Sequence, residues 1–149
     1  MFLFVDTDYL GHHSEYLKII IKNCIDHNIC ACFYVHPLFL NDLRESERSN
    51  DLVFYTSKVH EESSNAFKEM IFINGIIKKH HVSRCLLLNV NMYLKILPFI
   101  KISECKVSGI YFMPFLRKHK LGVIERVIKT ILFKALLVKP MMSQVFVLK

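Results

Sequence analysis

Short apolar runs alternate along this chain with longer segments in which apolar residues recur at helical spacing. Short apolar runs predict buried β-strands, whereas apolar positions three and four residues apart predict amphipathic helices. The pattern predicts six strands, at Phe2–Val5, Ile29–Val35, Leu52–Tyr55, Cys85–Leu88, Val107–Phe112 and Val145–Leu148. A polar segment from Pro37 to Asp51 is predicted to be a loop.

Three long helices are predicted between these strands, starting near Ser14, within 61–81 and at Val123–Val138. A shorter helix is predicted after Asn89 or Asn91 and is limited by Pro98. Core-facing positions are predicted to be Leu17, Ile20, Ile21, Cys24 and Ile25 in the first helix, Ala66, Met70, Ile73 and Ile77 in the second, and Val123, Val127, Ile131 and Leu132 in the third. Gly75 interrupts the second helix and indicates a close packing contact.

Apolar strands that alternate with amphipathic helices predict a parallel sheet covered on both faces. Right-handed crossovers then give a doubly wound, Rossmann-like, three-layer α/β/α domain over residues 1–149. Ligands bind such sheets beyond the carboxyl ends of the strands. The polar residues that follow predicted strands are therefore expected on one rim, and they are Asp6, Gly11, His12, His13, Ser57, Asn89 and Arg117.

Composition supports a globular domain, because 52% of the 149 residues are hydrophobic and only four are glycine. The five cysteines do not suggest a disulfide framework or a zinc spacing, so buried reduced thiols are expected. Cys30 and Cys32 are expected on one side of a strand. "MFLFVD" reaches Asp6 too early for a signal peptide, and no stretch has the length of a membrane span. A cytoplasmic protein is expected.

Charge is unevenly distributed within the net charge of +7. Residues 1–75 hold 6 basic and 11 acidic residues, whereas residues 76–149 hold 14 and 2. The basic half predicts either attraction between the two halves or a surface for an anionic partner. The segment "RKHKLGVIERVIKTILFKALLVKP" suits an ordinary covering helix or a peripheral position on an anionic membrane. Nucleic acid is not expected as a partner, because the cations lack a recognised motif and interleaved aromatic residues.

Asp6 and Asp8 follow the first predicted strand and raise the possibility of phosphoryl chemistry. Paired acids there resemble the Mg²⁺ site of haloacid-dehalogenase-like phosphatases, whose second motif Thr56 or Ser57 would supply. That family also needs a later acidic pair, and the corresponding positions hold Asn89 and Asn91. No metal site is predicted, and the structural alternative is that Asp8 braces the loop.

Gly11-His12-His13 lies between the first strand and the first helix. A glycine there lets the backbone approach a ligand, and a helix N-terminus suits phosphate. The G-x-G-x-x-G dinucleotide fingerprint is absent. Adjacent histidines at a helix start point in different directions and make a poor metal pair. The alternative is a helix start without a ligand.

The segment "FLFVDTDYLGHHSEYLKIII" resembles the opening of family-4-like glycosyltransferases of the GT-B fold. The matching residues are Gly11, His12, Tyr16 and Leu17, and "VSGIYFMPFLR" is similar to a later strand and loop of the same half. The resemblance covers most of the chain in element order. It departs from the family in having one loop glycine rather than a pair.

The resemblance implies a two-domain enzyme that transfers a sugar from a nucleotide-sugar to a saccharide or lipid-linked acceptor. This chain would be the amino-terminal, acceptor-side domain, with the donor-binding half and its Glu-x₇-Glu-like motif absent. It implies acceptor- or diphosphate-side contacts from Gly11, His12 and His13, and an acceptor phosphate contact from Arg117. No cofactor is expected beyond the nucleotide-sugar substrate. The expectation is a fragment that is inactive without a carboxyl-terminal domain or partner chain, and the alternative is a non-catalytic α/β binding module.

Overall fold

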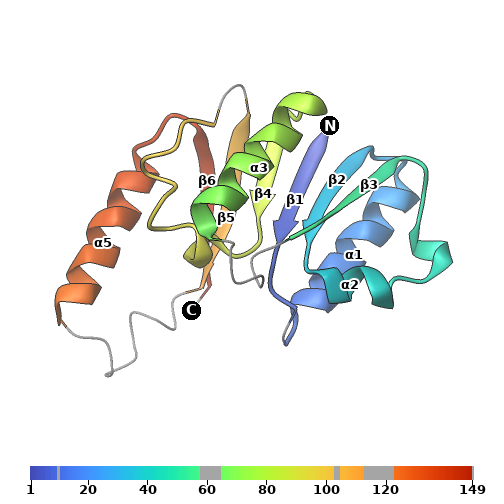
Figure 1. The fold of residues 1–149 in the computed structure, drawn as a ribbon, viewed down its shortest axis with the longest axis horizontal. Helices are drawn as coiled ribbons and strands as arrows, with labels where there is room; N and C mark the ends of the chain where they lie inside the picture. Colours follow the sequence, from blue (N-terminus) through green and yellow to red (C-terminus); the bar gives the residue numbers. More distant parts are fainter. Residues whose placement is uncertain (10, 58–64, 103–104, 113–122, 149) are drawn as a thin grey trace.

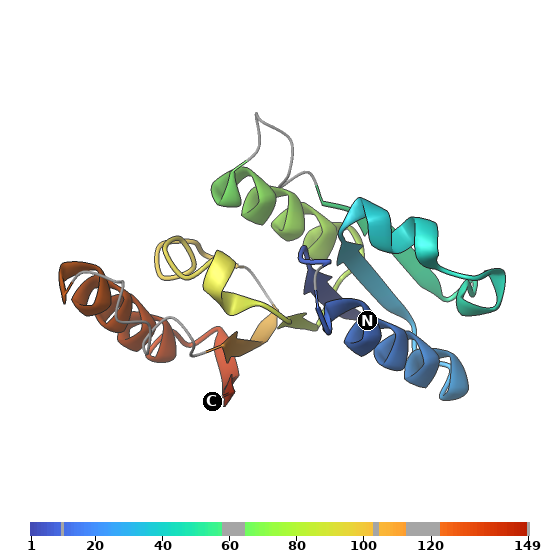
Figure 2. The same cartoon turned by 90° about the horizontal axis from the view of Figure 1, so that it is seen from below.

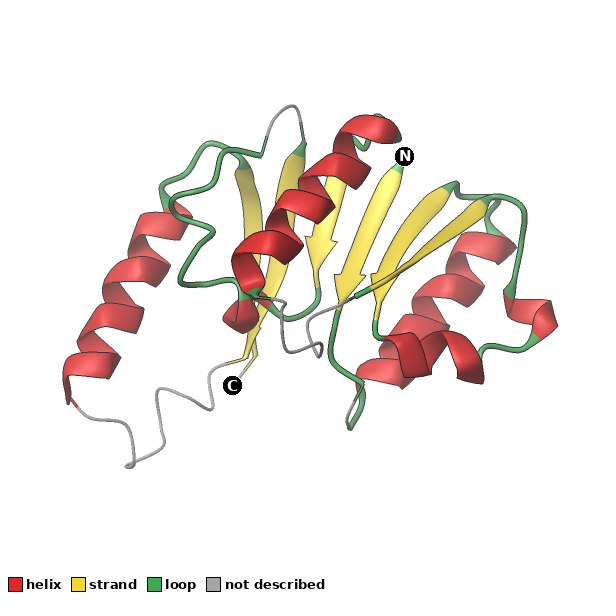
Figure 3. Cartoon of the chain, in the orientation of Figure 1, coloured by secondary structure: helices red, strands yellow, loops and turns green. Residues whose placement is uncertain are grey.

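A six-stranded parallel sheet forms the centre of the computed structural model, which describes residues 1–9, 11–57, 65–102, 105–112 and 123–148. Its strands are β1 (Phe2–Asp6), β2 (Ala31–Val35), β3 (Leu52–Thr56), β4 (Arg84–Leu87), β5 (Lys106–Phe112) and β6 (Met142–Leu148). The six strands stand in the order β3-β2-β1-β4-β5-β6 (Figure 1). All five neighbouring pairs are parallel, so the strand arrowheads point toward one edge (Figure 3). The fold is Rossmann-like, as predicted.

Helices connect the strands and lie on both sides of the sheet. They are α1 (His13–Asp26), α2 (Pro37–Asp42), α3 (Ala66–Lys79) and α5 (Val123–Leu137), with short 3₁₀ helices η1 (Glu45–Glu47) and η2 (Val90–Met92). Figure 2 shows α1 and α3 on opposite sides of the sheet, with the segment after η2 and α5 continuing the α3 side. This is the three-layer arrangement predicted from the alternating pattern.

Each side of the sheet has its own apolar core. On the α1 side, Leu17 and Ile21 pack with Phe33 of β2 and Phe39 of α2. On the α3 side, Met70 and Ile73 are fully buried in a larger cluster that includes Leu136 of α5. Phe33 stacks between Phe4 and Phe54, with ring centroids 5.2 Å apart in both contacts. The predicted core faces of α1 and α3 are confirmed.

The inward face of α5 differs from the prediction. Val127 and Ile131 are exposed, whereas Leu132, Phe133 and Leu136 pack toward the sheet. The Phe133 ring stacks on Tyr111 of β5, with centroids 4.5 Å apart. The prediction was right for Leu132, and the side chain of Val123 lies outside the description. The error arose because α5 has two apolar sides, and periodicity alone does not choose between them.

Three local predictions were also wrong. The segment after Pro37 contains α2 and η1 rather than only a loop, because Pro37 starts a helix whose N-cap is the His36 side chain. Gly75 makes no close contact, since a Cβ added there would meet nothing within 4 Å. Cys30 is exposed and precedes β2, whereas Cys32 is buried within it. All five cysteines are free, as expected.

Candidate functional site

The candidate site lies at the carboxyl edge of the sheet, between β1 and β4. β1 pairs with β2 on one side and with β4 on the other. The connections after these strands therefore diverge, and in sheets of this topology the crevice at the divergence is where ligands bind. A cavity of about 380 Å³ opens here. Its lining consists of Asp8, Asn89, Asn91, Met92, Leu94, Tyr111 and Lys129.

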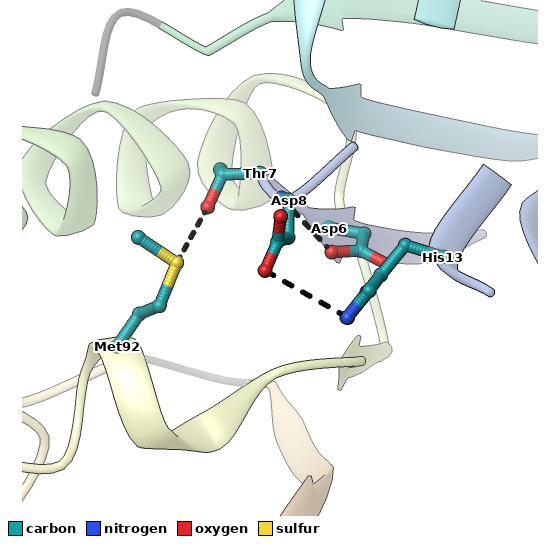
Figure 4. Close-up of polar contacts among 5 residues, drawn as sticks. All are labelled: Asp6, Thr7, Asp8, His13 and Met92. Atoms are coloured by element: carbon teal, nitrogen blue, oxygen red, sulfur yellow. Dashed lines mark hydrogen bonds and ion pairs between the residues drawn. The ribbon is translucent and has the colours of Figure 1, made fainter. Parts of the chain in front are cut away.

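A buried aspartate and a histidine join β1 to the start of α1 at this edge. Asp6 ends β1, and its side chain is 1% exposed. One carboxylate oxygen of Asp6 lies 2.7 Å from Nδ1 of His13, and the other accepts the backbone N–H of Asp8 at 3.1 Å. Nε2 of His13 lies 3.8 Å from the Asp8 carboxylate (Figure 4). His13 thus stands between two carboxylates, one buried and one at the cavity.

This environment stabilises the protonated form of His13. The hydrogen bond to Asp6 raises the pKa of the imidazole most, burial lowers it, and the charges of Asp6 and Asp8 raise it further, so the net shift is upward. A protonated ring donates through both nitrogens, which suits acceptors on its two sides. The shift therefore favours a cation that neutralises part of the charge on the two aspartates.

The remaining contacts of the β1 loop fix its path on both sides. The hydroxyl of Thr7 donates to the Met92 sulfur at 3.1 Å, which connects the loop to η2 (Figure 4). The Tyr9 hydroxyl bonds to the Asp42 carboxylate of α2, and the Tyr9 ring stacks on His36 at 5.6 Å. Thr7 and Tyr9 therefore anchor the segment after β1 to both η2 and α2.

A polar residue that follows β4, together with polar groups of β5 and α5, completes the cavity. The side-chain oxygen of Asn89 is enclosed and accepts no hydrogen bond from the described part of the chain. Tyr111 and Lys129 both line the cavity, and burial raises the pKa of Tyr111 while the charge of Lys129 opposes that rise. Carboxylate, amide, phenol and ammonium groups around an apolar floor suit a ligand with several hydroxyl groups.

The predicted site residues occupy different positions around this edge. Asp6, Asp8 and His13 come together, whereas Ser57 lies under α3 and donates to Glu69 at 3.1 Å. Gly11 has a φ of +70°, and His12 is the N-cap of α1 without a side-chain cap bond. Both are exposed and precede α1, and neither lines the cavity.

The two adjacent histidines point in different directions, as predicted. His12 approaches Tyr16, with ring centroids 6.3 Å apart, whereas His13 turns inward to Asp6. Arg117 lies outside the described residues.

Sequence reasoning missed four lining residues, namely Met92, Leu94, Tyr111 and Lys129. The predicted strand Val107–Phe112 contains Tyr111, but the pattern alone indicates a core residue for an aromatic side chain near a strand end. Lys129 belongs to the basic segment that is expected to form a covering helix or to lie on a membrane. Lys129 lies one helical turn before Phe133, which packs inward. A lysine on the inward side of a helix must place its ammonium group in a polar environment, and this position therefore indicates a polar cavity.

No cluster of three or more metal-ligating side chains occurs among the described residues. Asp6 is engaged by His13, and the positions where a phosphatase needs acids hold Asn89 and Asn91, which line the cavity as neutral amides. This arrangement does not favour the phosphatase alternative. No described helix is long and apolar enough to cross a membrane.

No family model, curated protein or solved structure matches this chain. Its function must therefore be inferred from the fold and from the chemistry of the cavity between β1 and β4.

Proposed function

We propose that this chain is the acceptor-side domain of a GT-B glycosyltransferase, which transfers a sugar from a nucleotide-sugar to a saccharide or lipid-linked acceptor. The resemblance of the first twenty residues suggests it, and the Rossmann-like fold is compatible with it. In this proposal the donor-binding half belongs to a further domain or partner chain. The cavity between β1 and β4 then receives the acceptor.

The observation that carries the proposal is the enclosed side-chain oxygen of Asn89 in the cavity lining. A buried acceptor without a donor costs free energy, and a ligand hydroxyl that donates to it would recover that cost. Asp8 and Asn91 border the same space and offer further acceptors and donors. These donors and acceptors suit the hydroxyl groups of a saccharide better than they suit a purely apolar ligand.

We assign His13 the role of positioning the Asp8 carboxylate, not that of transferring a proton. Its imidazole orients the Asp8 carboxylate at the cavity mouth, because Nδ1 is already committed to Asp6 and Nε2 faces Asp8. Gly11 and His12, at the exposed start of α1, would face the donor diphosphate once a donor half closes over them. The retaining or inverting outcome depends on groups of that other half.

Backbone amide NMR shifts of the ¹⁵N-labelled chain test the proposal. The probes are lactose, methyl α-mannoside and methyl α-glucoside as acceptors, and UDP-glucose and GDP-mannose as donors. We expect at least one saccharide to shift Asp8, Asn89 and Asn91, while the nucleotide-sugars leave them unchanged. Asn89→Ala should abolish the shifts.

Asn74→Ala is the matched control, because the Asn74 oxygen is also buried without a partner in the described residues but belongs to α3 rather than the cavity. It should retain the saccharide shifts. Shifts from nucleotide-sugars alone, equal loss in both variants, or no saccharide shift in a well-dispersed spectrum would each contradict an acceptor domain.

A further inference from the structure

Helix α5 carries a second apolar face that the domain leaves exposed. Leu132, Phe133 and Leu136 pack inward, yet Val127 and Ile131, which lie one turn apart, are exposed on the outer side, and Val138 is exposed just after the helix ends. Ile131 is 60% exposed. A helix that is apolar on both sides usually has a partner on both sides, and among the described residues the sheet side alone supplies one.

Helix α3, on the same side of the sheet, repeats this arrangement. Met70, Ile73 and Ile77 are buried, while Phe67 and Ile71 lie one turn apart on the outer side, with Ile71 57% exposed. The chain after η2 lies between the two helices in both views (Figures 1 and 2), and its residue Phe99 is 77% exposed. Bulky apolar side chains therefore project from three consecutive elements of one layer.

The exposed charged side chains that the structure describes in this layer are positive. Exposed lysines flank the apolar residues on every element, namely Lys68, Lys78, Lys95, Lys101 and Lys134. Among the side chains described from Asn65 to Phe146, the sole carboxylate is Glu69, and it is buried. We call this surface the outer face, defined by Phe67, Ile71, Phe99, Val127, Ile131 and Val138 with those five lysines.

We propose that the outer face binds the surface of an anionic lipid bilayer. Lysine chains that surround isolated bulky apolar groups suit an interface in which apolar tips enter the acyl boundary and ammonium groups meet lipid phosphates. Each basic residue near an anionic surface contributes about 1 kcal/mol. The apolar residues are spread over two helices and a loop, and a soft bilayer can accommodate such a dispersed set without a matching shape.

The charge also disfavours other occupants. A second copy of the chain would bring the same lysines against these, at a cost from like-charge repulsion. Nucleic acid would satisfy the lysines, but large aliphatic groups such as Ile71 and Ile131 add nothing to phosphate contacts. The proposal goes beyond the proposed sugar transfer and does not require it.

Flotation of the full chain with lipid vesicles tests the proposal. The vesicles are pure phosphatidylcholine, or an equimolar mixture of phosphatidylcholine and phosphatidylglycerol. We expect binding to the mixed vesicles, little binding to the neutral ones, and weaker binding as salt rises. No sugar ligand is present, so the outcome is separate from the test of the acceptor site.

Two variants locate the surface. Ile71→Ser with Ile131→Ser should weaken vesicle binding about tenfold or more, because both tips lose their insertion energy. Lys78→Glu with Lys134→Glu should weaken it by a similar factor. The matched controls lie on α1, where Ile19 is 58% exposed and Lys22 is exposed, so Ile19→Ser and Lys22→Glu should bind like the wild type.

The substituted side chains are exposed, so unchanged far-UV circular dichroism and melting are expected for all variants. Absence of binding to mixed vesicles at low salt would overturn the proposal. The proposal would also be overturned if the α1 controls lost vesicle binding to the same extent, or if the chain bound a single-stranded oligonucleotide but not the vesicles. Concentration-dependent dimerisation that Ile71→Ser with Ile131→Ser abolishes, without vesicle binding, would assign the face to self-association instead.

Discussion

The imidazole of His13 and the carboxylate of Asp6 are held 2.7 Å apart, and this contact connects the end of β1 to the first turn of α1. Asp6 is buried within the sheet edge, whereas His13 is partly open to the cavity side through Asp8. The pair therefore couples the interior of the fold to the rim of the candidate site. Its strength is measurable without any ligand.

Replacing His13 by Gln should lower the free energy of unfolding by about 2–3 kcal/mol, because the buried Asp6 carboxylate loses its charge-assisted partner. Equilibrium urea denaturation measures the change. His12→Gln is the control, since His12 is exposed and makes no cap bond, and it should change stability by about 0.5 kcal/mol or less. Equal effects of the two substitutions would show that the pair contributes nothing specific.

The same pair should make stability depend on pH in a defined direction. The folded state raises the pKa of His13 above its ordinary 6.5, so folding is favoured by protonation of this ring. The contribution is complete below the unfolded pKa and is lost as pH rises through the folded pKa. The difference in unfolding free energy between wild type and His13→Gln should therefore shrink as pH increases from 6 toward about 9. Urea titrations of both proteins across this range measure it, and a difference that grows with pH would reverse the assignment.

Periodicity predicted the sheet because its strands are short, apolar and separated by helices with clear inward faces. Leu17 and Ile21 in α1, and Met70 and Ile73 in α3, recur at helical spacing and are fully buried, as the pattern predicted. In α5 the Val127–Ile131 stripe competed with Phe133 and Leu136, and only the tertiary stack of Phe133 on Tyr111 decides between them. Local pattern carries no information on such a choice.

The candidate site was predictable only in part for a related reason. Asp6, Asp8 and His13 are close in sequence, so the strand end and helix start bring them together locally. Tyr111 and Lys129 reach the cavity from distant elements. Their proximity depends on the strand order β1-β4-β5 and on the rotation of α5, and neither quantity is encoded in spacing.

Gly109 is required by the close approach of η2 to β5. A Cβ at this position would lie 2.1 Å from Cγ2 of Val90 and 3.3 Å from the Leu87 carbonyl oxygen. Gly109→Ala should therefore destabilise the fold by about 1–3 kcal/mol through overpacking, as measured by urea denaturation. Combining it with Val90→Ala should show favourable coupling, because the second substitution removes the clashing methyl group.

Gly75→Ala is the control for Gly109→Ala. Gly75 lies inside α3, and an added Cβ would meet nothing within 4 Å, so Gly75→Ala should stabilise by up to about 1 kcal/mol through helix propensity. Destabilisation by both alanines, or neutrality of Gly109→Ala, would disagree with the geometry at η2.

Glu69 of α3 carries a buried carboxylate. It accepts hydrogen bonds from the Tyr34 hydroxyl and, at 3.1 Å, from the Ser57 hydroxyl, so that β2, the end of β3 and α3 meet at one group. Burial, followed by the hydrogen bond to Glu69, raises the pKa of Tyr34, so the phenol stays a donor. Tyr34→Phe leaves a buried carboxylate with one donor fewer and should cost about 1.5–3 kcal/mol.

Urea denaturation of Tyr34→Phe measures this cost against Tyr16→Phe, whose hydroxyl is on an exposed residue and should contribute about 0.5 kcal/mol or less. Because Ser57 shares the same carboxylate oxygen, Tyr34→Phe and Ser57→Ala together should depart from additivity. Strict additivity, with a Tyr34→Phe cost no larger than that of Tyr16→Phe, would mean that Glu69 does not hold the two hydroxyls as one network. The connection between the β3 end and α3 would then depend on apolar packing around Met70 alone.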